Sequence, residues 1–104
     1  MPFEGDSGVL KTVAGSAPRS LQQYTNQAPG EGKCRTFSIY CPDGTDPGIA
    51  ANTDTVYVGP NKSAAFPIAP GGWKDFEDVD PALVSFMCAT ANQLVFFAFG
   101  GSYV

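Results

Sequence analysis

The fold of this chain is decided by one stretch, which reads Asn52-Thr53-Asp54-Thr55-Val56-Tyr57-Val58-Gly59-Pro60 and continues to Ala65-Phe66-Pro67-Ile68-Ala69-Pro70-Gly71. Its two valines alternate with Thr55 and Tyr57, and this period of two is typical of a half-buried β-strand. The Gly59-Pro60 pair ends the strand, because these residues interrupt a hydrogen-bonded ladder and favour turns. The stretch therefore predicts a strand and turn in the sheet of a sandwich or barrel. It offers no nucleophile, general base or set of metal ligands.

The composition limits the classes of function. A chain of 104 residues predicts one domain with a modest core. Charged residues make up 15% of the chain, well below the usual quarter, while it has eight phenylalanines and no histidine. Few charges together with many aromatic residues favour a protein that hides much of its surface against a partner.

Charge and hydropathy argue against two kinds of partner. The net charge is −4 and the six basic residues are scattered, so we expect no nucleic-acid partner. No apolar run approaches the roughly 20 residues of a membrane span, so we expect no membrane partner. The N-terminus lacks the basic and then apolar pattern of a signal peptide, which predicts synthesis in the cytoplasm.

The three cysteines, Cys34, Cys41 and Cys88, are odd in number and lack metal-ligand spacing. A reducing compartment would keep them as thiols. We expect them to be buried or half-buried small hydrophobic residues rather than disulfide partners or reactive groups. No cofactor or metal is expected.

Residues 1–32 are rich in Gly, Ser, Pro, Gln and Ala, and no helical period survives in them. They predict an extended N-terminal arm with one or two edge strands, over residues 8–14 and 19–25. Residues 33–104 predict the folded domain.

The first convincing strand runs from Lys33 to Cys41, with alternate residues on opposite faces. The turn residues that follow, 42–48, predict a surface loop. Asp43 and Asp46 fall short of the 6–8 oxygens that calcium takes, so we interpret them as Asx-turn residues.

Residues 73–79 predict a polar strand whose carboxylates are divided between its two faces, with Asp75 and Glu77 on one and Asp78 on the other. Paired carboxylates such as Asp75 and Glu77 can hydrolyse glycosides. Nothing in this polar segment would raise a carboxylate pKa, so a solvated edge strand or a polar contact to a partner is the favoured interpretation.

Residues 83–90 and 93–100 predict a hairpin around Ala91-Asn92 that is apolar on both faces. One small domain can hardly cover both faces of two adjacent strands, so the hairpin predicts a homo-oligomer. The resulting seven or eight short strands predict an all-β protein, a single small jelly roll or β-sandwich of antiparallel strands. The expected interface residues are Leu10, Leu21 and Tyr24 from the arm and Phe86, Phe97 and Phe99 from the hairpin.

Four sequence segments, taken in their order along the chain, resemble segments of small accessory virion proteins of tailed phages. They are residues 35–40, the Asn52–Gly59 strand, residues 66–72 and the Ala89–Gln93 turn between the two hairpin strands. The resemblance covers residues 33–99, although the loop after Gly59 is shortened and the 41–48 loop is longer than in that group. It implies a jelly-roll capsid decoration or cement protein, located on the virion surface, that binds major capsid protein subunits and often forms a trimer.

Two other classes of function stay open. A head-fibre or tail-associated module could contact host-surface glycans through Trp73, Tyr40, Tyr57 or Tyr103, although core or interface positions are favoured for each of these aromatic residues. A cupin-type enzyme is disfavoured because metal-dependent cupins rely on histidine ligands and this chain has none. The sequence therefore predicts a structural protein and not an enzyme.

Overall fold

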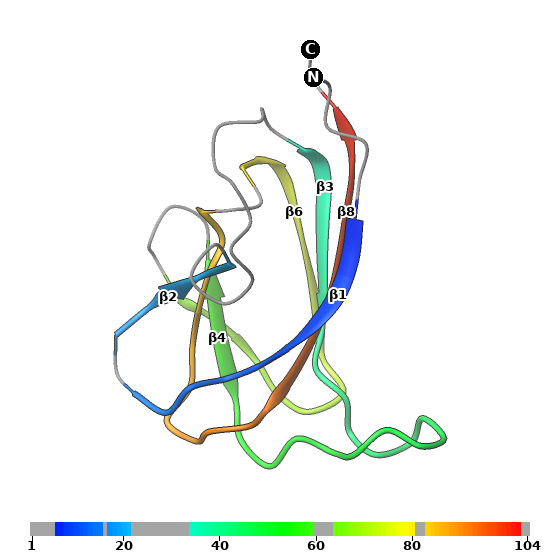
Figure 1. Ribbon diagram of the computed structural model, residues 1–104, viewed down its shortest axis with the longest axis vertical. Coiled ribbons are helices and arrows are strands. Elements are labelled where there is room, and N and C mark those ends of the chain that lie inside the picture. The colour runs from blue at the N-terminus through cyan, green and yellow to red at the C-terminus, as the bar shows by residue number, and fades with distance from the viewer. Residues whose placement is uncertain (1–5, 16, 22–33, 60–63, 81–82, 103–104) are drawn as a thin grey trace.

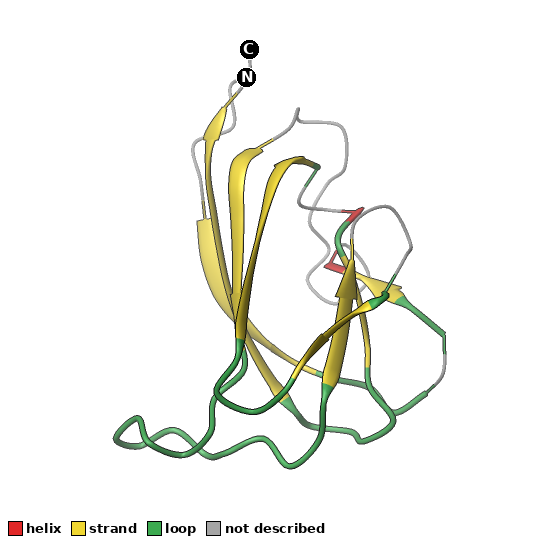
Figure 2. Ribbon diagram, turned by 180° about the vertical axis from the view of Figure 1, so that it is seen from behind, coloured by secondary structure: helices red, strands yellow, loops and turns green. Residues whose placement is uncertain are grey.

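The protein is a sandwich of two antiparallel β-sheets, as seen in a computed structural model whose described residues are 6–15, 17–21, 34–59, 64–80 and 83–102. The two sheets lie face to face, and the described loops that join them, including residues 41–55, 69–72 and 88–93, gather at one end of the sandwich (Figures 1 and 2). The predicted β-sandwich class is therefore confirmed. Eight strands form the sheets: β1 (Asp6–Lys11), β2 (Arg19–Ser20), β3 (Cys34–Tyr40), β4 (Val56–Gly59), β5 (Phe66–Ile68), β6 (Trp73–Val79), β7 (Ser85–Met87) and β8 (Leu94–Ser102).

Strands that are neighbours in a sheet are mostly distant in the sequence. One sheet has the order β1-β8-β3-β6 and the other the order β2-β7-β4-β5. β1 pairs with β8, β2 with β7, β3 with β6 and β4 with β5, all antiparallel. Two further pairings, β3 with β8 and β4 with β7, complete the sheets.

The side chains between the sheets form one apolar core. The alternation predicted for the first strand is confirmed, because Phe37 and Ile39 are buried while Thr36 faces solvent. The rings of Phe37 and Phe97 stack with their centroids 6.2 Å apart. The core comprises Leu10, Leu21, Phe37, Ile39, Cys41, Val56, Val58, Ile68, Phe76, Val84, Phe86, Cys88, Val95 and Phe97.

The predicted hairpin of residues 83–100 is wrong. β7 pairs with β2 and β4, whereas β8 pairs with β1 and β3, so the connection between β7 and β8 crosses from one sheet to the other. Within this connection the backbone of Asn92 lies in the left-handed region, with φ 64°. Asparagine adopts this conformation more readily than most residues. Thr12 holds the crossing from the end of β1, since it bonds the backbones of Thr90, Asn92 and Gln93.

The two strands expected within residues 8–14 and 19–25 are both present, as edge strands of the two sheets. The first begins at Asp6 and ends at Lys11, and beyond it Ala14 makes an isolated bridge to Cys88. The second is limited to Arg19 and Ser20, which pair with β7. The rest of the expected arm falls on residues 1–5 and 22–33, which lie outside the described residues.

Candidate functional site: the outer face of the β1-β8-β3-β6 sheet

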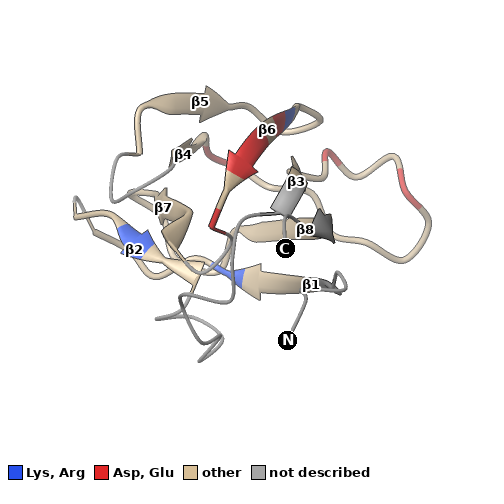
Figure 3. Cartoon of the chain, turned by 90° about the horizontal axis from the view of Figure 1, so that it is seen from above, with Lys and Arg blue, Asp and Glu red and all other residues tan. Residues whose placement is uncertain are grey.

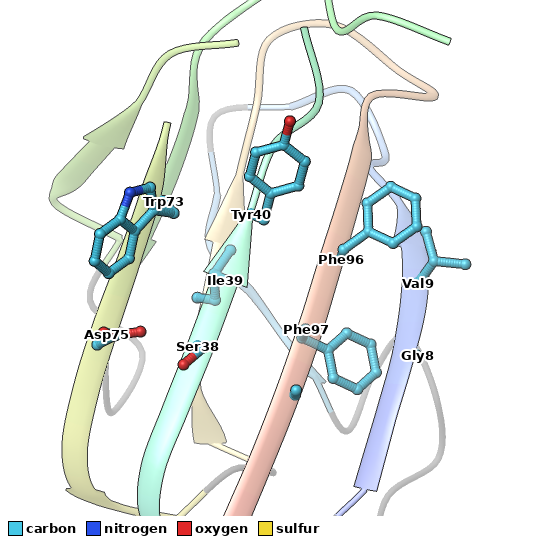
Figure 4. Close-up of a pocket in the computed structure, with 10 residues that line it drawn as sticks. Gly8, Val9, Ser38, Ile39, Tyr40, Trp73, Asp75, Phe96 and Phe97 are labelled. Atoms are coloured by element: carbon cyan, nitrogen blue, oxygen red, sulfur yellow. The ribbon is translucent and has the colours of Figure 1, made fainter. Parts of the chain in front are cut away.

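An apolar row crosses the outer face of the β1-β8-β3-β6 sheet. Each member stands opposite the next in the strand register, so the row runs across all four strands (Figure 4). We call this the outer row, and its members are Val9 on β1, Phe96 on β8, Tyr40 on β3 and Trp73 on β6.

The outer row is open to solvent at both ends. Trp73 is 69% exposed and Val9 is 51% exposed, whereas Tyr40 and Phe96 between them are half-buried. The rings of Tyr40 and Phe96 lie 6.5 Å apart at an angle of 44°. The row lines an open hollow of about 840 Å³. Exposed large apolar side chains that adjoin one another mark binding surfaces more often than scattered ones do.

A second, more polar row lies next to the outer row on the same face. Strand pairing places Ala98 of β8 opposite Ser38 of β3, and Ser38 opposite Asp75 of β6. All three residues line the same hollow. Hydroxyl and carboxylate groups therefore stand beside the aromatic rings, and they can accept hydrogen bonds from a ligand.

The β3–β4 loop fixes the orientation of Tyr40. Its hydroxyl donates a hydrogen bond to Asp46 Oδ2 at 2.8 Å, and this bond raises the pKa of Tyr40. The loop itself is shaped by Asp43, whose Oδ1 accepts hydrogen bonds from the Thr45 N–H and hydroxyl at 3.0 and 2.6 Å. The predicted Asx turn is thus confirmed for Asp43, whereas the Asp46 carboxylate binds the Tyr40 hydroxyl. In Figure 3 the loop projects from the sandwich beside β3 and β8, away from the other sheet.

The surroundings of the outer face are acidic. Asp75 and Glu77 on β6 are exposed, and Asp43 and Asp46 lie on the adjacent loop (Figure 3). Lys74 belongs to the other side of β6, where its ammonium lies 4.7 Å from the ring centroid of Phe66 and 5.7 Å from that of Phe76. β6 is an edge strand with exposed charges, as predicted.

The residues expected at a subunit interface mostly belong to the core instead. Leu10, Leu21, Phe86 and Phe97 are each at most 8% exposed. Alternation along the strands points Leu10, Phe86 and Phe97 between the two sheets, and Leu21 follows β2 directly, where its N–H donates to the Val84 carbonyl. These four side chains therefore offer no surface to a partner in this fold. Tyr24 lies outside the described residues. The backbone of Phe99 lies on β8, where it pairs with Asp6 and Phe37.

Sequence reasoning weighed Trp73 and Tyr40 as possible sugar-stacking residues but missed Val9 and Phe96. The available signal was the alternation in β8, where Phe96 and Ala98 fall on the face opposite to Val95 and Phe97. Of the other aromatic residues weighed, Tyr57 is 39% exposed on the outer face of the opposite sheet. Tyr103 lies outside the described residues.

A polar cluster beneath the β7–β8 crossing joins Cys88 to Asp54. The Cys88 thiol lies 3.8 Å from Asp54 Oδ2, which also accepts a hydrogen bond from the Thr90 hydroxyl at 2.8 Å. Burial raises the pKa of Cys88, whereas the Thr90 hydroxyl lowers the pKa of Asp54. The proton therefore stays on the sulfur, and such a thiol is not an activated nucleophile. Within the described ranges, no group of three or more His, Cys, Asp or Glu residues is placed to hold a metal ion.

Cys41 and Cys88 confirm the expectation of buried thiols, and the structure predicts how Cys41 reacts. Burial is the main cause that raises the pKa of Cys41 from 9.0 to about 12, and the neighbouring Cys88 adds to it. A thiol reagent at pH 8 is expected to label Cys41 only in denaturant, as read by mass spectrometry of its peptide. Because the folded pKa is raised, the thiol's contribution to stability is complete below pH 9 and is lost as the pH rises towards 12.

The control for this prediction is Cys41→Ala, which removes the titrating group. Its urea midpoint should decline less than that of the natural chain between pH 9 and 11. Labelling of Cys41 in the native protein at the rate seen in denaturant would contradict the buried position.

No family model, no curated protein and no solved structure matches the chain. In the described part of the chain, no helix is both long enough and apolar enough to span a bilayer.

Proposed function

We propose that this protein is a jelly-roll accessory protein of a tailed-phage virion, most simply a decoration protein that binds the assembled head and bridges major capsid protein subunits. The observation that carries the jelly-roll assignment is the strand pairing. β1, β2, β3 and β4 pair in turn with β8, β7, β6 and β5. This pairing of the first four strands with the last four in reverse order supports a jelly roll of the kind found in viral capsid proteins.

The free side of β1 supports attachment to the capsid by strand addition. β1 is an edge strand, and in the described part of the chain no strand pairs with the side of β1 that faces away from β8. Thr12 donates its N–H to the Gln93 carbonyl at 2.9 Å, so the alternation of an antiparallel ladder aims the Val9 N–H away from β8. An extended capsid segment could pair there through backbone hydrogen bonds.

We keep the homotrimer in this proposal, but its subunits would meet through residues other than the apolar hairpin predicted from the sequence. The two-faced hairpin no longer requires it, because β7 and β8 lie in facing sheets and share one core. Contacts between subunits would use exposed residues, and light scattering of the purified protein measures the mass directly.

Capsid attachment is tested by co-sedimentation with phage heads assembled without this protein. We expect saturable binding, and heads that resist heating better when the protein is bound. Val9→Pro removes the outward N–H and is expected to weaken binding by at least about tenfold, since proline cannot donate to a ladder. Val9→Ala keeps the N–H and is the matched control. Absence of binding by the natural chain would refute the decoration role, while equal binding by both variants would refute strand addition at β1.

A second candidate function is supported by the outer row. A head-fibre or tail-associated module that contacts host-surface glycans would present exposed aromatic rings beside polar groups. Trp73, Tyr40 and Asp75 lie together in that way on one sheet face.

A further inference from the structure

We propose that the outer face of the β1-β8-β3-β6 sheet binds a neutral, pyranose-containing glycan, with one sugar ring stacked on Trp73 and its hydroxyls bonded to Asp75 and Ser38. This inference deepens the second candidate function and rests on it. It names the site, the contacting groups and the charge class of the ligand.

The aromatic part of the site is suited to a sugar ring. One face of a pyranose carries C–H bonds with partial positive charge, which complement the negative face of an aromatic ring. The Trp73 indole is 69% exposed, so its face is available without any rearrangement. Tyr40 stands on the neighbouring strand, about 4.8 Å away in the sheet. A chain of two or three sugars could therefore cross from one ring to the next along the outer row.

The site is preorganised. The Tyr40 hydroxyl is bonded to Asp46, and its ring packs beside Phe96, so its orientation is fixed before a ligand arrives. The indole is carried by a strand and not by a loop. A surface that is already ordered loses less conformational entropy on binding, which favours weakly bound ligands such as sugars.

The polar part of the site lies at the distance that sugar hydroxyls need. Asp75 is two residues after Trp73 on the same face of β6, which places the two Cα atoms roughly 7 Å apart. Ser38 stands opposite Asp75 on β3. A carboxylate accepts hydrogen bonds from two adjacent hydroxyls, and the serine hydroxyl can donate or accept. Ala98 beside them is small, which leaves room for the ring substituents.

The charge of the surroundings selects the class of ligand. Asp75 and Glu77 on the face and Asp43 and Asp46 on the loop outnumber Lys11, which shares the outer face of β1 with Val9. The acidic excess would repel sialylated, sulfated or phosphorylated glycans. The same charges disfavour a second copy of this chain seated face to face, because two acidic surfaces would meet. A neutral glycan meets neither penalty.

The test uses the chain's single tryptophan as its reporter. The purified full chain is screened on an array of neutral and anionic oligosaccharides, and each hit is titrated while the emission of Trp73 is followed. We expect at least one neutral glycan to shift the emission in a saturable way and to protect Trp73 from iodide quenching. Anionic analogues of the same glycan should bind more weakly, and increasingly so at low salt.

Variants locate the site. Trp73→Ala is expected to weaken binding at least about tenfold by calorimetry, and Asp75→Asn about three- to tenfold. Both residues are exposed, so both variants should keep the natural unfolding midpoint. Tyr57→Ala changes an exposed aromatic residue on the outer face of the other sheet and should bind the glycan normally.

Three results would overturn the inference. They are an array without neutral hits, a hit whose affinity survives Trp73→Ala, and a free protein in which Trp73 is already shielded from iodide and the mass is that of an oligomer. The last result would assign the face to a second copy of the chain. None of them bears on co-sedimentation with heads, so failure of the glycan site and failure of the decoration role can be told apart.

Discussion

Replacing Phe86 with alanine is expected to lower the free energy of unfolding by about 3–5 kcal/mol, the cost of emptying a phenylalanine site in a core. Phe86 is completely buried, on the central strand β7 between β2 and β4. Its backbone stands opposite Val58 and Arg19, so the lost ring leaves a cavity between the sheets that neighbouring strands cannot close. Urea denaturation followed by circular dichroism measures the loss.

The same experiment decides whether Phe86 lies in the core or at a subunit interface. A core residue gives a loss that is independent of protein concentration, whereas an interface residue gives one that grows on dilution. Phe66→Ala is the matched control, because this phenylalanine is 45% exposed and makes an edge contact with Phe76 at 5.7 Å. Its loss should be clearly smaller. Equal losses for Phe86 and Phe66 would mean that the core is not where the structure places it.

Replacing Gln93 with alanine is expected to cost about 2–3 kcal/mol, although Gln93 is polar. Its Oε1 accepts the backbone N–H groups of Thr53 at 2.6 Å and Asp54 at 3.0 Å, and its Nε2 donates to Thr53 Oγ1 at 3.2 Å. The side chain thus ties the loop before β4 to the start of β8. Truncation leaves two donors without their acceptor near the protein interior. Thermal and urea unfolding measure the cost.

Gln93→Glu separates the two roles of this side chain. Glutamate keeps an acceptor for both N–H groups, but it loses the donor and adds a charge at a site that is 6% exposed, so it should recover part of the loss. A larger loss for glutamate than for alanine would show that the cost of the buried charge exceeds what the acceptor contributes. Asn52 plays a parallel part, because its amide bonds both the N–H and the carbonyl of Leu94, at 2.7 and 2.8 Å.

Local pattern was enough to predict most strands. The alternation in residues 33–41 matches β3, and the stretch that ends at Gly59 matches β4, with both valines buried and Tyr57 exposed. These predictions hold because the period of side chains along a strand depends only on the strand itself and on one buried face.

The pairing of strands could not be predicted in the same way. Residues 83–90 and 93–100 are close in sequence and both apolar, which suggested a hairpin, yet they face each other across the core. The deciding contacts are non-local: Thr12 caps the crossing from the end of β1, and the Asn52 and Gln93 amides bind the β3–β4 loop to β8. The same error led to the prediction that Phe86 and Phe97 lie at a subunit interface. The inner face of each strand is covered by the facing sheet of the same molecule, so it needs no partner to bury it.

The candidate site was predictable only in part. Trp73 and Tyr40 stand out by residue type, but their meeting with Val9 and Phe96 depends on the register of four strands drawn from both ends of the chain. A shift of one residue in any of these registers would move that member of the outer row to the core face.

The central place of β8 has a consequence for biosynthesis. β8 leaves the ribosome after the other seven strands of the sandwich, and it lies between β1 and β3, whose sheet it completes. Until β8 is made, β1 lacks the strand with which it pairs in the described structure, and β3 lacks its β8 neighbour. The sheet that covers one side of the core is then incomplete. A nascent or truncated chain therefore carries unpaired edges and exposed aromatic residues, the features that recruit chaperones and promote aggregation. Folding of the sandwich therefore waits for the synthesis of β8, and its rate depends on how quickly β1 and β8, which are far apart in the sequence, find each other.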